Sequence, residues 1–155
     1  MIAVIQRVSK AAISVKGDQI ARIDNGLVIL LGVIADDDET DCQFLQNKIG
    51  HLRIFNDEND KMNLSLKDIS GEALVVSQFT LCGDWRKGRR PSFINAAAPE
   101  RGEKLYNLFV EYMDSDNIPT KTGRFGAMME VSLVNDGPVT FVLDSRVNKK
   151  EKIIN

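Results

Sequence analysis

The sequence predicts an α/β protein of layered, predominantly antiparallel, barrel-like sheets with two main helices. Three observations lead to this fold class. Short runs rich in Val and Ile are separated by tight-turn signals, two segments repeat apolar residues at helical spacing, and the predicted strands outnumber the helices. With 155 residues, 43% hydrophobic and 27% charged, the chain can bury a core without disulfides or metal ions.

Three strands are predicted to open the fold. Residues 3–15 are rich in Val and Ile, and the turn at 16–18 leads into a second strand over 19–23. Asp24-Asn25-Gly26 is the next turn, because Asn-Gly tolerates the positive φ angles of a type I′ turn. Residues 27–33 are continuously apolar, which predicts a strand buried on both faces.

Two helices follow from the spacing of apolar residues. The acidic run 36–39 suits the start of the first helix, where negative charge is stabilised, and we favour this interpretation over a metal site. The inward stripe of that helix is Cys42, Leu45, Ile49 and Leu52. The second helix begins near Pro99. Its apolar stripe is Leu105, Leu108, Phe109, Tyr112 and Met113.

Further strands are predicted over residues 72–78, 129–134 and 139–144. The last two are joined by Asn135-Asp136-Gly137-Pro138, which from sequence alone is an ordinary turn, although X–Pro bonds are where cis peptides occur.

We interpret residues 1–145 as a single domain, followed by a polar tail, 146–155, that we expect to be flexible. The first residues lack the features of a signal peptide, and no apolar run approaches the roughly 20 residues that span a bilayer. The expected compartment is therefore the cytoplasm, with no membrane partner.

Composition excludes several chemistries. Cys42 and Cys82 are widely separated and are expected to be free thiols. His51 is the single histidine, falls on the first predicted helix, and is best interpreted as structural, so a zinc site is not expected. No dinucleotide, P-loop or HExxH motif occurs, and we expect no metal and no cofactor. A formal net charge of −2 means that any contact with nucleic acid must come from a local basic patch.

The segment Ser77-Gln78-Phe79-Thr80-Leu81 is the first candidate site. It follows an apolar strand, so hydroxyl side chains and backbone N–H groups can face solvent at a sheet edge and stabilise an oxyanion. The alternative is a strand end where Ser and Thr satisfy local backbone groups.

The loop 83–93 is the second candidate. Arg86, Lys87, Arg89 and Arg90 place four positive charges within five residues, between Trp85 and Phe93. Cations neutralise phosphates and aromatic rings stack on bases, which indicates a phosphate-binding site for nucleic acid as one interpretation and a solvated charged loop as the other.

These segments resemble the D-aminoacyl-tRNA deacylase family, and the resemblance runs from Met1 to about Ser145. The matching segments, in order, are 3–8, 52–55 with 61–65, 77–81, 86–93, 122–127 and 135–140. Within this likeness, Cys82-Gly83-Asp84-Trp85 stands where the family carries a run similar to Tyr-Ala-Asp-Thr. The resemblance implies a D-aminoacyl-tRNA deacylase-like fold and a homodimer with its active sites at the interface.

The resemblance also implies a substrate and a mechanism. It implies hydrolysis of D-aminoacyl-tRNA, and of glycine mischarged on tRNA(Ala), with Ser77, Phe125 and Met129 lining the substrate pocket. Gly137 and Pro138, in the cis form, would enter the partner's pocket and reject L-amino acids. Thr80 has been proposed in the family as a nucleophile, and the alternative is assistance by the 2′-hydroxyl of the tRNA.

An aminoacyl ester is already activated, so its hydrolysis needs mainly positioning and oxyanion stabilisation. We therefore expect the N–H groups of Phe79 and Thr80 to be oxyanion donors and Gln78 to orient the substrate. The hypothesis from another class is a non-catalytic tRNA- or DNA-binding module.

Overall fold

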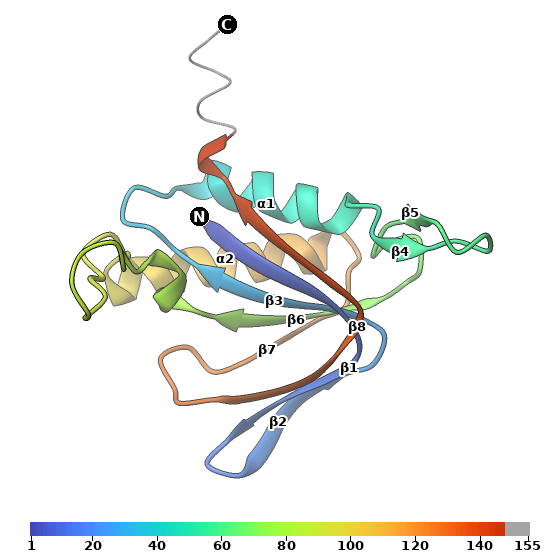
Figure 1. Ribbon diagram of the computed structural model, residues 1–155, viewed down its shortest axis with the longest axis horizontal. Helices are drawn as coiled ribbons and strands as arrows, with labels where there is room; N and C mark the ends of the chain where they lie inside the picture. The colour runs from blue at the N-terminus through green and yellow to red at the C-terminus, as the bar shows by residue number, and fades with distance from the viewer. Residues whose placement is uncertain (148–155) are drawn as a thin grey trace, which may run out of the picture.

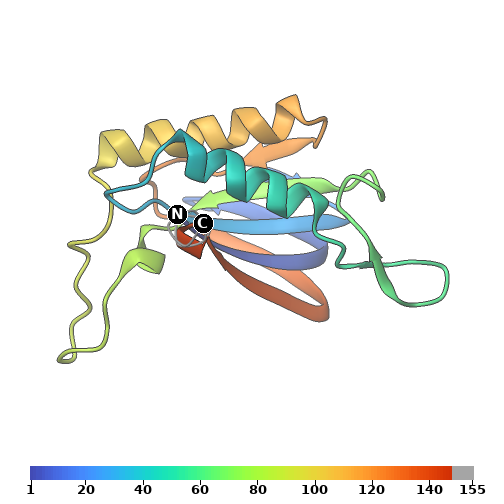
Figure 2. The same cartoon turned by 90° about the horizontal axis from the view of Figure 1, so that it is seen from above.

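The computed structural model describes residues 1–147 and places two helices against one face of a strongly curved sheet (Figures 1 and 2). Its elements, in chain order, are β1 (Ile2–Val15), β2 (Asp18–Ile23), β3 (Gly26–Gly32), α1 (Glu39–His51), β4 (Phe55–Asn56), β5 (Met62–Leu64), β6 (Glu72–Ser77), the 3₁₀ helix η1 (Phe79–Cys82), α2 (Pro99–Ser115), β7 (Thr120–Thr122) and β8 (Glu130–Asp144). No helix within the described residues is both long and apolar enough to cross a membrane.

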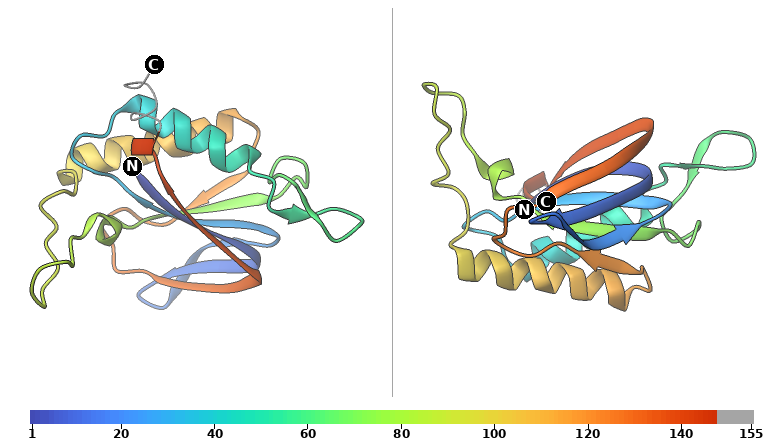
Figure 3. Two further views of the ribbon diagram at one scale, coloured as in Figure 1. Left: turned by 45° about the horizontal axis from the view of Figure 1, so that its top comes forward. Right: turned by 90° about the horizontal axis from the view of Figure 1, so that it is seen from below.

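Strand β1 organises the sheet. One edge of β1 pairs with β8 along nearly its whole length, while the other edge pairs first with β3 and then with β2. The sheet order is β2-β1-β3-β6-β7, in which only the β3–β6 and β6–β7 pairs are parallel. The sheet curls so that Lys121 in β7 donates to the Arg22 carbonyl in β2 at 2.6 Å (Figure 3). The predicted α/β, mainly antiparallel and barrel-like fold is confirmed.

The curl creates two apolar cores. One lies between the sheet and the helices, and the other lies inside the curl around Val8, Ile13 and Leu74. Strand β3 serves both, because Leu27, Ile29 and Leu31 pack toward the helices while Val28 packs inside the curl. This alternation explains why its sequence is apolar at successive positions.

The acids before α1 have structural roles, as expected. Asp38 is the N-cap of α1, and its carboxylate accepts from the N–H of Thr40 at 2.9 Å in a capping box completed by Asp41. Asp37 accepts from the N–H of Ile34 at 2.6 Å and from the amino group of Met1. Helix α2 begins at Pro99, as its sequence predicts.

The prediction of two strands joined by a turn near residue 137 is wrong, because β8 is continuous from Glu130 to Asp144. The polar Asn-Asp-Gly-Pro run forms an irregular bulge in β8. There the register of the pairing between β1 and β8 shifts between Gln6 and Val8. The Asn135 amide replaces part of the ladder, because its Oδ1 accepts from the Val139 N–H at 3.0 Å and its Nδ2 donates to the Val139 carbonyl at 3.2 Å.

The short strands β4, β5 and β7 and the helix η1 were not expected from the sequence. The predicted polar tail spans residues 146–155. Within it, Arg146 forms an ion pair with Asp144, and residues 148–155 lie outside the described residues.

Candidate active site

The predicted Ser77–Thr80 segment lies where buried strand β6 ends at the surface. Val76 is 2% exposed, whereas Phe79 is 59% exposed. The Gln78 N–H donates to the Leu31 carbonyl at 2.8 Å, which continues the pairing with β3 for one residue beyond β6. Helix η1 then turns the chain away, so Phe79 and Thr80 face solvent at the carboxyl end of a rigid parallel strand pair.

The hydroxyl of Thr80 is oriented by an amide. Gln78 Nε2 donates to Thr80 Oγ1 at 2.5 Å, and this is the one hydrogen bond of that hydroxyl within residues 1–147. An amide NH₂ cannot remove a proton, so this contact orients Thr80 without activating it as a nucleophile. Helix η1 begins at Phe79 and has no side-chain cap, and the first N–H groups of a helix lack partners within it. The N–H groups of Phe79 and Thr80 can therefore donate to an oxyanion.

The base of the cationic loop contacts this segment. The Phe93 ring packs edge-on against the Phe79 ring, with centroids 5.0 Å apart. Asp84 and Ser92 exchange two backbone hydrogen bonds of 2.7 and 2.9 Å, which close the loop between them. Trp85 at the loop is 77% exposed.

The four predicted tRNA-binding cations are not equivalent. Arg86 Nε and Nη2 each donate to the Asp84 carboxylate at 2.8 Å, and this guanidinium lowers the pKa of Asp84 to about 2. Lys87, Arg89 and Arg90 are exposed and have no ion pair within the described part of the chain. The free positive charge of the loop therefore resides on these three residues.

Gly137 and Pro138 form the exposed tip of the bulge in β8. Their peptide bond is cis, and Gly137 has φ +126°, a conformation that L side chains rarely adopt. A Cβ at Gly137 would lie 2.9 Å from the backbone nitrogen of Val139 and 3.1 Å from Nη2 of Arg7. The bulge therefore requires glycine at this position.

Within one protomer the structure does not bring the Gly137-Pro138 tip to the Ser77–Thr80 segment. Val8 pairs with both Asn135 and Gly26, and Gly26 pairs with Glu72, so the bulge is level with the first residue of β6. Ser77 is the last residue of that strand, five residues or about 16 Å further along. Figure 1 likewise shows the bend of β8 and the segment after β6 at opposite ends of the sheet.

Arg7 is a site residue that sequence reasoning missed. Its side chain is 8% exposed, and its Nη1 donates to the Ile54 carbonyl at 2.7 Å and to Asn56 Oδ1 at 3.2 Å. Its Nε lies 3.1 Å from the Asp136 carboxylate and donates to the Asp136 carbonyl at 3.2 Å. Arg7 thus ties the residue before Gly137 to β4 and to the residue that precedes it. The sequence signal that could have identified this role is a charged residue in the middle of a strand rich in apolar residues.

We predict that Arg7→Met destabilises the fold by about 1–3 kcal/mol, because the buried Ile54 carbonyl loses its partner. Urea unfolding followed by circular dichroism measures this change. Lys10→Met, the same replacement at an exposed position of β1, is the matched control and should lie within about 0.5 kcal/mol of the unmodified protein. Equal effects of the two variants would contradict the anchoring role of Arg7.

Phe125 and Met129, predicted to line the substrate pocket, pack against the interior. The ring centroid of Phe125 is 5.8 Å from that of Tyr106 in α2, and the Tyr106 hydroxyl donates to the Val75 carbonyl in β6 at 2.8 Å. Met129 packs inside the curl, where its sulfur faces Gly123. Both side chains are partly exposed, so they lie at the margin of the core on the loop between β7 and β8.

The other reactive side chains are structural in this fold. Cys42 and Cys82 are free and buried, as expected, and burial raises the pKa of Cys42 to about 12 and also raises that of Cys82. His51 is the last residue of α1 and its Nδ1 lies 2.9 Å from the Asn47 carbonyl. Within residues 1–147 no group of three or more His, Cys, Asp or Glu side chains could hold a metal ion.

Comparison with known proteins identifies relatives along nearly the whole chain. The family model for D-Tyr-tRNA(Tyr) deacylase matches residues 4–144. D-aminoacyl-tRNA deacylase of Thermosipho africanus is 58% identical over 94% of this chain and 98% of its own length. The enzyme of the same name from Desulfatibacillum aliphaticivorans is 56% identical over 94% of this chain and 100% of its own length.

Two solved structures have the same fold. A protein named c-Myc DNA Unwinding Element Binding Protein is 41% identical, covers 93% of this chain and 98% of its own, and superposes with a TM-score of 0.89. "Structural Analysis of a probable eukaryotic D-amino acid tRNA deacylase" describes a second, 19% identical, with a TM-score of 0.79 over 92% of this chain and 98% of its own, which shows the fold alone.

The sheet-edge segment and these relatives define the class of protein as a hydrolase of the ester bond of aminoacylated tRNA. The chain belongs to the D-Tyr-tRNA(Tyr) deacylase family.

Proposed function

We propose that the protein releases D-amino acids from tRNA at a pocket built on Ser77–Thr80. The observation that carries this proposal is the exposed Gln78–Thr80 pair at the end of a buried strand, in a chain 58% identical to a D-aminoacyl-tRNA deacylase. The N–H groups of Phe79 and Thr80 stabilise the oxyanion, and Gln78 orients the acyl group. Water attacks with help from the 2′-hydroxyl of the terminal adenosine, because within residues 1–147 no base is hydrogen-bonded to Thr80 to activate it.

The pocket is completed by a second copy of the chain. The Gly137-Pro138 tip and the Ser77–Thr80 segment lie at opposite ends of one protomer, so a two-fold related partner can bring the tip of one chain to the pocket of the other. Apolar side chains are exposed at both ends of such an interface: Phe79, after β6, is 59% exposed, and Val134, beside the bulge in β8, is 46% exposed. Strand β8, which pairs only with β1 in the described chain, supplies an unpaired edge between them.

The inserted Gly137-Pro138 tip distinguishes D-amino acids from L-amino acids. The carbonyl oxygens of Gly137 and Pro138 occupy the space that the side chain of an L-amino acid would need, and a D-amino acid directs its side chain elsewhere. Glycine has no side chain to reject, so glycine mischarged on tRNA(Ala) is a second substrate. Phe125 and Met129 contribute the apolar wall of this pocket, and Ser77 contributes a hydroxyl at its base.

A binding protein without catalysis is the competing function, and it is favoured by the name of the relative that binds a DNA unwinding element. Release of tyrosine from D-Tyr-tRNA and from L-Tyr-tRNA separates the two. Our proposal requires turnover of the D-ester and little turnover of the L-ester. Tight binding of both tRNAs without release of either amino acid would support the binding protein instead. Turnover of simple esters without RNA would indicate a general esterase.

The loop 83–93 is proposed to hold tRNA through its unpaired cations. Arg89→Gln with Arg90→Gln should lower the dependence of log affinity on log salt concentration by about two, because each phosphate contact contributes about one. The loss of affinity is therefore largest at low salt. Arg86→Gln is the matched control and should have a smaller effect, since Asp84 already neutralises Arg86. Filter binding of uncharged tRNA over a salt series measures it, and an unchanged slope in the double variant would remove the loop from the interface.

We also propose a cytoplasmic location, because aminoacylated tRNA, the substrate, is made and used there.

A further inference from the structure

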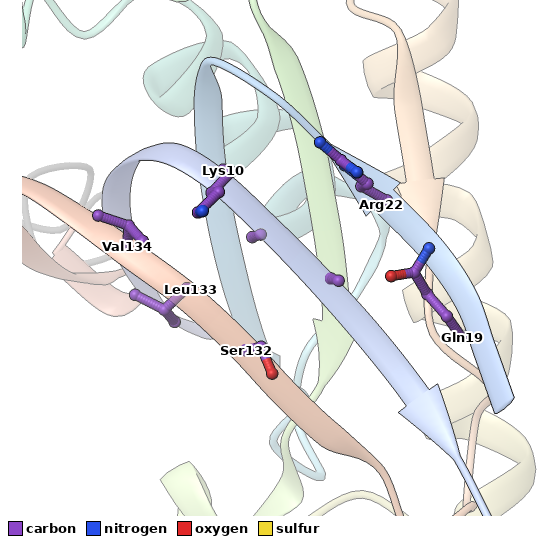
Figure 4. A pocket seen from close by; sticks show the side chains of 8 residues that line it. Lys10, Gln19, Arg22, Ser132, Leu133 and Val134 are labelled. Carbon is purple, nitrogen blue, oxygen red and sulfur yellow. The ribbon is translucent and has the colours of Figure 1, made fainter. Parts of the chain in front are cut away.

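A hollow of about 280 Å³ lies on the outside of the curled sheet, where β8, β1 and β2 run side by side (Figure 4). It is remote in the chain from the Ser77–Thr80 segment and from the loop 83–93. The hollow is lined by Lys10, Ala11 and Ala12 from β1, Gln19 and Arg22 from β2, and Ser132, Leu133 and Val134 from β8.

The strand register explains why the sheet is hollowed here. Ala12 pairs with Arg22 on one side and with Ser132 on the other. Residues paired across neighbouring strands project from the same face. The methyl group of Ala12 therefore lies between two larger side chains, and Figure 4 shows Arg22 and Ser132 on opposite sides of this floor. Lys10, two residues earlier in β1, projects at one end beside its partner Val134.

The lining is positively charged and rich in hydrogen-bond donors. Lys10 and Arg22 carry full positive charges, Gln19 and Ser132 add neutral donors, and none of the carboxylates among residues 1–147 lines the hollow. The nearest ion pair is Arg22 with Asp24 at 3.3 Å, with side chains 61% and 77% exposed. Exposed pairs of this kind are weak and are readily exchanged for another anion. In a chain of net charge −2 such a cation-only hollow is a local exception.

The hollow also adjoins the bulge in β8. Val134 pairs with Lys10, and Asn135, the next residue, begins the bulge that carries Gly137 and Pro138. Under the proposed function this bulge lies at the partner's pocket, where the 3′ end of tRNA is held. Nucleotides that lead to that 3′ end would therefore pass the hollow of the chain that donates the bulge.

We propose that the hollow bounded by Lys10, Arg22, Gln19 and Ser132 binds backbone phosphates of the tRNA acceptor arm. This inference rests on the proposed function and extends it, because it assigns the RNA a second contact surface besides the loop 83–93. Lys10 and Arg22 neutralise the phosphate charge, and Gln19 and Ser132 donate hydrogen bonds to its oxygens. The contact is independent of base sequence and of the esterified amino acid.

A charge-matched pair of double variants tests this site. Lys10→Gln with Arg22→Gln removes two positive charges from the hollow, and Lys48→Gln with Lys61→Gln removes two from exposed positions elsewhere. The affinity of each protein for uncharged tRNA is measured between about 50 and 200 mM salt. Turnover of D-tyrosyl-adenosine, which has no phosphate, is measured in parallel, together with the sedimentation coefficient.

The hollow variant is expected to lower the salt slope by about two, so that over this range the unmodified protein loses about sixteenfold more affinity than the variant. Turnover of D-tyrosyl-adenosine and sedimentation should stay unchanged, and the control variant should follow the unmodified protein. An unchanged slope overturns the inference. Loss of D-tyrosyl-adenosine turnover also overturns it, because the residues would then belong to the pocket. A change in sedimentation overturns it as well, because the hollow would then contact a second copy of the chain.

The same measurements separate this inference from the proposed function. If the hollow variant lowers the salt slope as expected but the unmodified protein releases no D-tyrosine, the deacylase proposal fails and the phosphate site stands.

Discussion

Hydrolysis of D-Tyr-tRNA should slow by about 10²–10⁴-fold when hydrogen replaces the 2′-hydroxyl of its terminal adenosine, whereas Thr80→Ala should retain activity within about tenfold. The reason is the surroundings of Thr80. Its hydroxyl accepts from the Gln78 amide at 2.5 Å, and no group that could take its proton is bonded to it within residues 1–147. The substrate therefore has to supply the hydroxyl that assists the attacking water.

Single-turnover release of labelled D-tyrosine, with the affinity of each tRNA measured separately, distinguishes chemistry from binding. Gln78→Ala is the companion variant, because it removes the orienting amide and leaves the Thr80 hydroxyl. We expect it to lower the rate without changing the affinity for tRNA. A Thr80→Ala protein that binds the substrate normally but releases nothing would assign catalysis to Thr80 and overturn the assignment to the tRNA.

Discrimination between D-Tyr-tRNA and L-Tyr-tRNA should fall by about 10- to 200-fold in Pro138→Ala, the range that a pocket gains from excluding a small group. The bulge is held on both sides of its tip: Arg7 binds Asp136 before it, and Asn135 binds the backbone of Val139 after it. Replacing the rigid ring of Pro138 frees the tip between these anchors, so an L side chain can displace it.

The ratio of kcat/KM for the two esters is the measurement. Pro119→Ala, at an exposed proline between α2 and β7, is the matched control and should keep the full ratio. The D-ester should be hydrolysed by Pro138→Ala at nearly the original rate, since the Ser77–Thr80 segment is untouched. Loss of activity toward both esters with the ratio preserved would mean that the tip supports the pocket without judging chirality.

The elements that the sequence predicted correctly are those with strong periodic patterns. The continuous apolar run of β3 is explained by two cores that need alternate side chains of one strand, and Asp38 caps α1 as the acidic run indicated. Strands β4, β5 and β7 have only two or three residues, too few for a pattern to be seen.

In the candidate site, too, local sequence patterns predict one part and miss the features that depend on distant contacts. The exposed Gln78–Thr80 segment follows from an apolar strand that ends in hydroxyl residues, which is a local signal. The continuity of β8 through the Asn-Asp-Gly-Pro run is not local, because it depends on the Asn135 amide and on pairing with β1. Arg7 is likewise distant in sequence from Ile54, Asn56 and Asp136, the three residues to which it donates hydrogen bonds, so only the fold shows its role.

Under the proposed function, the distance between the Gly137-Pro138 tip and the Ser77–Thr80 segment requires a second chain to complete the pocket, and mixed dimers test that requirement most directly. One chain carries Pro138→Ala and an intact pocket, and the other carries Thr80→Tyr, which fills the pocket and leaves the tip intact. In a mixed dimer the active pocket receives the intact tip. Hydrolysis of L-Tyr-tRNA by the Pro138→Ala chain should therefore fall when excess Thr80→Tyr chain is co-assembled, while D-Tyr-tRNA is still hydrolysed. Unchanged hydrolysis of L-Tyr-tRNA in the mixed dimer would contradict the account.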